Sequence, residues 1–192
     1  MITIPKYKIS EFEDIRNGYN FGNRIDLKFA SEITCLYYEF AYYQILGFSD
    51  TYNKFFKEAP DDHDSIISYL NQSWSQAYAI YALLRTCIEA IRKINKGLLS
   101  ENQISDHYKY RIKEIIDITN DIIKHPMFNN TNDSSDTSIA YRPISLDIGG
   151  EIDVERWIDQ SSPSDTLKIS PMRDFETVQN YIKHIAQLLK PE

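Results

Sequence analysis

The chain has 192 residues, which is enough for one well-buried core and short for two ordinary domains. Its formal net charge of -7 argues against a protein whose whole surface binds nucleic acid, because such binding relies on Lys and Arg. No stretch reaches the roughly 20 uncharged apolar residues that a membrane-spanning helix needs, and the first residues lack the apolar core of a signal peptide. We therefore expect a single cytoplasmic domain over residues 1–192, with no contact to a membrane.

The first helix is expected after an irregular lead-in segment at residues 1–22, where Gly18 and Gly22 interrupt any period. A helical pattern runs from about residue 24 to residue 46, and Gly47 is expected to end it. The alternating spacing of four and three predicts that one face of this helix is buried in the core: Phe29, Ile33, Leu36, Phe40 and Tyr43.

The second helix has the clearest pattern, with apolar residues at three-four spacing over about seven turns. Asp64 or Ser65 is expected to cap its start, and Gly97 to follow its end. A second apolar row predicts neighbours on two sides, so we place this helix at the centre of the fold. The main row is Ile67, Leu70, Trp74, Ala77, Tyr81, Leu84, Ile88 and Ile91, and the second is Ile66, Ile80, Cys87 and Ile94.

Two further helices are predicted, one on each side of an insertion. The third runs from about Ser105 to Lys124 and cannot continue through Pro126, so residues 24–126 hold helices one to three. The fourth occupies residues 171–190, where Ser170 and Pro171 form a typical cap and first-turn pair. Both have one apolar face, as expected for helices that pack in a bundle.

The insertion at residues 127–170 has a different composition. Residues 129–138 are a polar run of Asn, Ser, Thr and Asp that predicts a loop. Apolar and polar residues then alternate on both sides of Gly149 and Gly150, which is typical of a β-hairpin, and residues 166–169 are a candidate third strand. We therefore expect an all-α fold, a four-helix bundle with a small β-hairpin inserted between helices three and four.

Chemistry that depends on a cofactor or a metal has little support in the sequence. Cys35 and Cys87 have no partner at metal-ligand or redox spacing, and we interpret both as reduced core thiols. The acidic run at residues 61–64 precedes a strong helix start, so capping explains it better than metal binding. Glycine loops for phosphate, GxSxG turns and HExxH pairs do not occur. We predict no cofactor and no metal site.

The third predicted helix closes with residues 120–126, Asn-Asp-Ile-Ile-Lys-His-Pro. This ending resembles the end of the catalytic helix in HEPN proteins, an all-α family with many RNases and toxins. Their motif is an arginine, roughly four to six intervening residues, and a histidine. The positions that would hold the arginine are Ile118, Thr119 and Asn120, so the motif arginine is absent here. The resemblance covers about residues 65–126 and implies an HEPN-like bundle.

In that family the histidine is thought to act as acid or base near the 2′-hydroxyl of RNA, and the arginine to hold the phosphate. The resemblance implies His125 and Asn120 as catalytic residues, and Arg85 and Lys124 as residues that bind RNA or a nucleotide. It also implies a homodimer around a shared cleft, and a nucleotidyltransferase-like antitoxin as a partner. The residues alone allow structural roles: His125 as a helix-capping histidine, Lys124 as a solvated lysine, and Arg85 with Glu89 as a helix-stabilising pair.

Three hypotheses for the function follow. The first is a catalytically degenerate HEPN-like binding or regulatory module, linked to stress response or defence, which binds RNA or a nucleotide. The second is a toxin-like, metal-independent endoribonuclease that uses His125, with Arg85 in the phosphate role. The third is a structural protein-interaction module whose hairpin and polar loop contact a partner.

Overall fold

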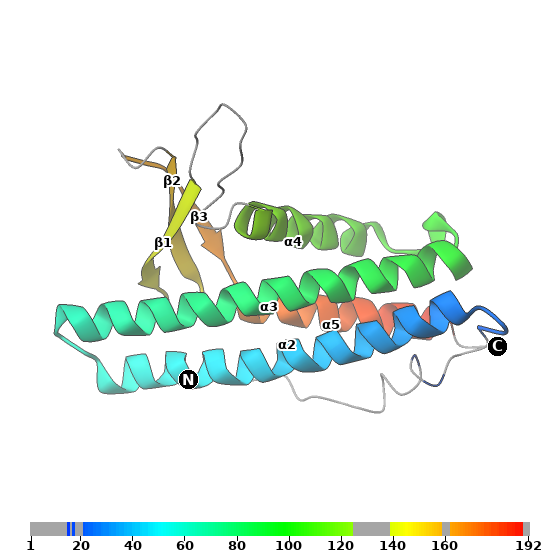
Figure 1. Cartoon of the computed structure of the whole chain (residues 1–192), viewed down its shortest axis with the longest axis horizontal. Coiled ribbons are helices and arrows are strands. Elements are labelled where there is room, and N and C mark those ends of the chain that lie inside the picture. The colour runs from blue at the N-terminus through cyan, green and yellow to red at the C-terminus, as the bar shows by residue number, and fades with distance from the viewer. Residues whose placement is uncertain (1–14, 16, 18–20, 125–138, 159–161, 190–192) are drawn as a thin grey trace.

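The computed structural model of the chain describes residues 15, 17, 21–124, 139–158 and 162–189. Within these residues the protein is mostly helical, with four long helices and one three-stranded antiparallel sheet (Figure 1). The helices are α2 (Ile25–Glu58), α3 (His63–Leu98), α4 (Asp106–Lys124) and α5 (Pro171–Leu188), and the strands are β1 (Ile139–Leu146), β2 (Ile152–Ile158) and β3 (Ser162–Ile169). None of the described helices is both long and apolar enough to cross a membrane.

Helix α2 is longer than predicted, because it continues through Gly47 to Glu58. At Gly47 a Cβ atom would lie 3.0 Å from the side-chain nitrogen of Gln76 on α3, so the glycine serves a close approach between two helices. The helix ends instead where Ala59 adopts a left-handed conformation with φ of 43°, and its N–H donates to the carbonyl of Phe55. Tertiary packing thus overrides the stop signal expected at Gly47.

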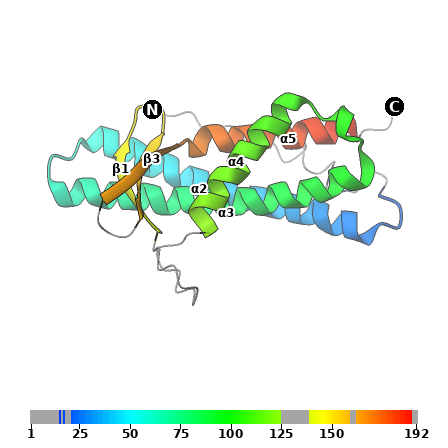
Figure 2. The ribbon, with the colours of Figure 1, turned by 90° about the horizontal axis from the view of Figure 1, so that it is seen from above.

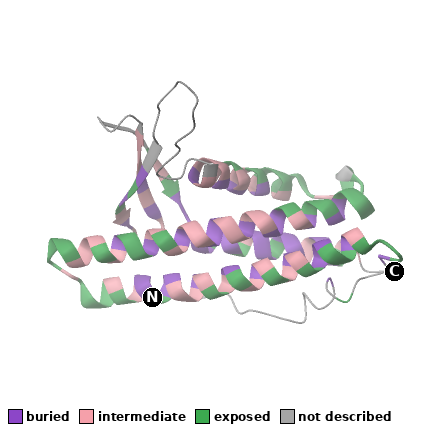
Figure 3. Cartoon of the chain, viewed as in Figure 1, coloured by how far each residue is buried: buried purple, intermediate pink, exposed green. Residues whose placement is uncertain are grey.

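The predicted buried face of α2 is wrong, because most of it faces outward. Phe29, Leu36, Phe40 and Tyr43 are between 43% and 61% exposed. A second row with the same spacing lies on the opposite side of the helix and packs in the core: Leu27, Ser31, Thr34, Tyr38, Ala41, Ile45, Phe48 and Tyr52. Small residues in this inner row let α2 and α3 run side by side along most of their length (Figure 3).

Helix α3 lies at the centre of the fold, as predicted, and contacts α2, α4, α5 and β1. Its N-terminal cap is Asp62, not Asp64 or Ser65, because the Asp62 Oδ1 atom accepts a hydrogen bond of 2.8 Å from the N–H of Ser65. Gly97 lies inside the last turn and does not follow it. Seen from above, α4 crosses α3 obliquely, and α5 runs roughly along α3 (Figure 2).

The predicted hairpin and third strand are confirmed, in the order β1-β2-β3. Val154 in the central strand pairs with Pro143 of β1 and Leu167 of β3, and the register shifts just after Pro143. Two contacts of Tyr141 attach the sheet to the helices. Its ring lies 6.1 Å from that of Trp74 on α3, and its hydroxyl donates to the carbonyl of Asp121 on α4 at 2.9 Å.

The bounds of the last two helices agree with the sequence to within about two residues. Helix α4 begins at Asp106 and α5 begins at Pro171. The predicted loop at residues 129–138 lies outside the described residues, as does the predicted stop at Pro126.

Candidate functional site

The predicted site lies at the C-terminal end of α4, and the structure describes it in part. His125 lies outside the described residues, and of Lys124 only the helical backbone is described. Asn120 is half-buried, and its Oδ1 atom has no hydrogen-bond partner among the described residues. This end of α4 is attached to the sheet, since Asp121 contacts Tyr141 and lies 3.8 Å from Arg156.

Arg85 forms the helix-stabilising pair that was considered as its structural alternative. Its Nε atom lies 2.9 Å from the Oε1 atom of Glu89, one turn later on α3. The Arg85 side chain is 26% exposed. An arginine engaged in this way is a weaker candidate for a phosphate ligand than one with no carboxylate beside it.

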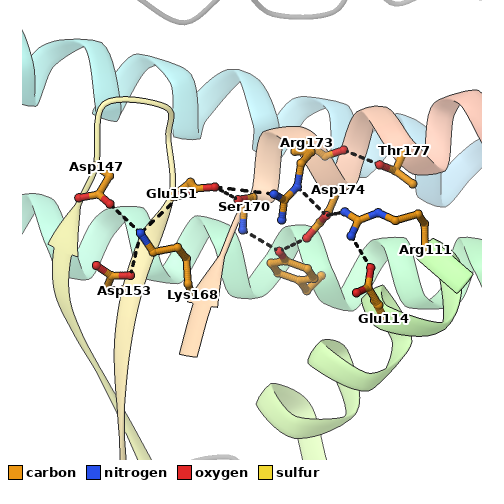
Figure 4. A network of polar contacts seen from close by, with 11 residues as sticks. Arg111, Glu114, Asp147, Glu151, Asp153, Lys168, Ser170, Arg173, Asp174 and Thr177 are labelled. Atoms are coloured by element: carbon orange, nitrogen blue, oxygen red, sulfur yellow. Dashed lines mark hydrogen bonds and ion pairs between the residues drawn. The ribbon is translucent and has the colours of Figure 1, made fainter. Parts of the chain in front are cut away.

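A polar junction joins α3, α4 and the start of α5 (Figure 4). Its centre is the fully buried Tyr81, whose hydroxyl donates to the Oδ2 atom of Asp174 at 2.6 Å and accepts from the N–H of Ser170 at 3.3 Å. Arg111 of α4 approaches the other oxygen of Asp174 at 3.4 Å and also pairs with Glu114. Burial raises the pKa of Asp174, although Tyr81 and the arginines favour its charged form.

The junction continues into the sheet through Glu151, Lys168 and two aspartates. The Ser170 hydroxyl donates to Glu151 at 2.8 Å, which connects the residue just before β2 to the cap of α5. The Lys168 ammonium lies 2.9 Å from Asp147, 3.5 Å from Glu151 and 3.5 Å from Asp153. The hydrogen bond to Asp147 is the largest cause of a raised pKa at Lys168.

A hollow of about 350 Å³ opens beside this junction, but its charges are balanced. Three cations and three carboxylates line it, and the junction pairs Arg111, Lys168 and Arg173 with carboxylates. A site whose cations are already neutralised has little attraction left for an anion. We interpret this junction as the connection that positions the sheet and α5 on α3.

A larger pocket of about 470 Å³ lies between the end of α3, the start of α4 and α5. We call it the basic pocket, because the described residues that line it include three cations and no carboxylate: Arg92, Asn95, Lys96, Leu99, Ile104, Lys109, Ile112 and Tyr181. Among the described residues no ion pair involves Arg92 or Lys96. Lys109 pairs at 2.9 Å with Asp106, whose side chain is 96% exposed. The pocket therefore carries positive charge that the described part of the chain neutralises little.

Two buried polar side chains meet at the wall of the basic pocket. Asn95 and Tyr181 are 5% and 4% exposed, and the Asn95 Nδ2 atom donates to the Tyr181 hydroxyl at 2.5 Å. The Asn95 Oδ1 atom has no hydrogen-bond partner within the part of the chain that the structure describes. Burial raises the pKa of Tyr181, against smaller opposing effects of Arg92 and Asn95, so its hydroxyl stays protonated and able to donate. A buried polar atom without a partner is uncommon and calls for an explanation.

The basic pocket lies away from the residues that the sequence singled out. Lys109 and Lys124 are 15 residues apart on one helix, which corresponds to about 22 Å. Arg85 lies seven residues before Arg92, two turns away on the same face of α3. The signal that could have located the pocket is Asn95, a polar residue that continues the buried row of α3 four residues after Ile91.

Comparison with known proteins gives this chain no relative. No family model matches it, and no curated protein or solved structure matches it significantly. The described residues also contain no group of three His, Cys, Asp or Glu side chains that could hold a metal ion. The assignment of a function to the chain therefore depends on the geometry of the basic pocket.

Proposed function

We propose that this protein is a binding module that takes a small phosphorylated ligand, a nucleotide, in the basic pocket. The observation that carries the proposal is a cavity whose described lining combines three cations, no carboxylate and Asn95, whose Oδ1 atom has no hydrogen-bond partner in the described part of the chain. Its volume of about 470 Å³ is within the range of roughly 300–1,000 Å³ that small-molecule sites occupy.

The phosphate of the ligand would contact Arg92, Lys96 and Lys109. Arg92 offers a planar fork of donors that matches phosphate oxygens, and the two lysines add point charges. Arg92 and Lys96 are one turn apart on α3, and Lys109 approaches from α4, so the three cations come from two helices. Of these three cations only Lys109 pairs with a carboxylate among the described residues. Phosphate binding should therefore be favourable, and it should weaken as salt is added.

The remainder of the ligand would contact the apolar and polar walls. Leu99, Ile104 and Ile112 form an apolar surface suited to a base or a similar flat ring. Asn95 and Tyr181 line the same wall, and they supply an amide oxygen that can accept a hydrogen bond and a hydroxyl that can donate one. A ligand hydroxyl or amide both accepts and donates, so such a group can satisfy both atoms.

The charge of the chain favours a small ligand over a long nucleic acid. The net charge is -7, while the positive charge of this site is limited to one pocket. Binding to a long RNA would need further cations along the surface to replace counterions. A mononucleotide needs only the few cations that the pocket provides.

The test is binding of AMP, ADP, ATP and inorganic phosphate, measured by titration calorimetry at low salt. The decisive variant combines Arg92→Ala with Lys96→Ala, and we expect it to weaken nucleotide binding at least tenfold. The matched control combines Lys93→Ala with Lys113→Ala, which removes two exposed positive charges from α3 and α4, the helices that supply the cations of the pocket, at positions outside the pocket. We expect the control to bind within about twofold of the wild type, and added salt to weaken both.

Three outcomes would overturn the proposal. One is a wild-type protein that binds none of the four probes. Another is an equal loss in the pocket variant and the control, which would indicate a general effect of charge. The third is a protein that binds an RNA oligonucleotide through Arg92 and Lys96 and no mononucleotide, since that would assign the pocket to RNA.

We further propose that the chain is a four-helix, HEPN-like bundle that lacks the motif arginine and has a regulatory role. Three features support this proposal: the order of the four helices, the sheet inserted before the last one, and the end of α4 at Lys124, within the residues that resemble the HEPN motif. Incubation of structured RNAs with the wild type and with His125→Ala in EDTA tests the absence of catalysis. Intact RNA is expected from both proteins. Cleavage that only the wild type performs would replace the regulatory role with that of a ribonuclease.

A further inference from the structure

Helix α2 presents a row of large apolar side chains to solvent. This outer row consists of Ile25, Phe29, Leu36, Phe40 and Tyr43, which are 79%, 61%, 43%, 45% and 57% exposed. The row spans five turns of the helix, and its members lie within a narrow angular range on the face opposite α3. Single exposed apolar residues are ordinary, but a continuous row of five indicates an interaction surface.

The area of the outer row is close to that of a protein interface. A large aromatic side chain offers about 150–250 Å², so the exposed fractions of the five residues amount to roughly 600 Å². Two such rows packed together would remove roughly 1,200 Å² from water, which exceeds the roughly 1,000 Å² that a specific interface needs. At about 25 cal/mol per Å², this burial is a substantial driving force for association.

The spacing of the outer row fits another helix of the same kind. From Phe29 onward, apolar residues follow steps of four and three, with half-buried Ile33 completing the pattern, which is the spacing of helices that pack almost in parallel. The inner row of α2 has the same spacing and already packs on α3. A second copy of the chain offers an identical outer row, and identical rows are complementary across a two-fold axis.

Polar residues line the row on both sides, as the rim of an interface requires. Lys28, Glu32 and Glu39 follow one flank, and Tyr37 and Gln44 follow the other. Charged side chains at the rim keep the separate chain soluble and limit the contact to the apolar row between them.

We propose that α2 pairs with α2 of a second copy of this chain through the outer row, which gives a homodimer. The surface is separate from the basic pocket, because no residue of α2 lines that pocket. The proposal therefore does not depend on the proposed ligand.

The test measures the oligomeric state of the full chain by light scattering, at concentrations from about 1 to 100 µM. The wild type is expected at twice the single-chain mass of 22.5 kDa. The variant that combines Phe29→Glu with Phe40→Glu places charges in the row, and we expect its dissociation constant to rise at least about 100-fold. Both side chains already face solvent, so the far-UV circular dichroism of this variant should match that of the wild type.

The matched control places the same two charges on exposed apolar residues elsewhere. Ile148 and Tyr110 are 87% and 63% exposed, and neither lies on α2. The combined variant Ile148→Glu and Tyr110→Glu should remain dimeric. A monomeric wild type at 100 µM would overturn the proposal. A dimer that tolerates both charges in the outer row would also overturn it.

Discussion

Replacement of Tyr81 by phenylalanine tests the polar junction that connects α3 to α5. The change removes one hydroxyl and keeps the ring, so it opens almost no cavity. It removes the 2.6 Å hydrogen bond to Asp174 and leaves the N–H of Ser170 without the acceptor that lies 3.3 Å away. Both partners are almost fully buried, at 1% and 4% exposed, so water cannot readily replace the hydroxyl.

The expected loss follows from the kinds of hydrogen bond involved. A hydrogen bond to a charged group contributes about 1.5–3 kcal/mol, and a buried donor without a partner costs about 1–3 kcal/mol. The second bond is long, so we take the lower part of that range for it. We therefore expect Tyr81→Phe to lower the free energy of unfolding by about 2–4 kcal/mol near neutral pH.

The loss should also depend on pH, through the protonation of Asp174. Burial raises the folded-state pKa of Asp174 above its unfolded value, so this group makes the fold less stable as pH rises through that interval. The Tyr81 hydroxyl opposes this effect by favouring the carboxylate, and its removal raises the pKa of Asp174 further. The difference between wild type and variant should therefore be largest near neutral pH and smaller at acidic pH, where Asp174 is protonated in both.

The assay is urea unfolding followed by far-UV circular dichroism, at about pH 7 and about pH 4. The control is Tyr78→Phe, which removes a hydroxyl from a half-buried tyrosine one turn earlier on α3 and should change stability by less than about 0.5 kcal/mol. Loss of less than about 1 kcal/mol at neutral pH would refute the role of the junction. An equal loss at both pH values would refute the assignment of the effect to Asp174.

Two further predictions concern the inner row of α2 and the charges of the sheet. Phe48→Ala removes a fully buried ring and should cost about 3–5 kcal/mol in urea unfolding, whereas Phe40→Ala, measured on the dissociated chain, should cost less than about 1 kcal/mol. Equal costs would mean that the buried and exposed rows are assigned wrongly. Lys168→Met removes the ammonium shared by Asp147, Glu151 and Asp153, so these carboxylates repel one another. The melting temperature should fall near neutral pH, and the difference from the wild type should shrink in high salt and at acidic pH. A difference that salt and acid leave unchanged would contradict this electrostatic reading.

Local signals were sufficient for the elements whose ends depend on a few neighbouring residues. Pro171 sets the start of α5, and Gly149 with Gly150 allows the turn between β1 and β2, where Gly150 has φ of 74°. The pattern of α3 is strong enough that its central position was predictable. These features depend on backbone geometry and on one dominant apolar face, both of which can be read from consecutive residues.

Helix α2 was less predictable, because it carries two apolar rows with the same period. Periodicity shows that both rows exist, but only the shape of α3 decides which one packs in the core. The inner row contains the small residues Ser31, Thr34 and Ala41, which allow close approach, while the outer row contains larger rings. For the same reason, the sequence predicted that Gly47 ends the helix, whereas in the fold Gly47 is a position where α2 packs closely beside Gln76.

The basic pocket depends on tertiary structure for a further reason. Its cations come from α3 and α4, and its polar wall from α3 and α5, so no local motif contains them. The sequence by itself determined four amphipathic helices, a hairpin and a stretch over residues 85–124 that contains eight Lys or Arg and six Asp or Glu. The pairing of Arg85 with Glu89 lies within one helix and could be expected from the sequence, whereas only the packing of three helices decided which cations share a cavity. Charge is set by composition, but the distance between charges on different helices is set by the fold.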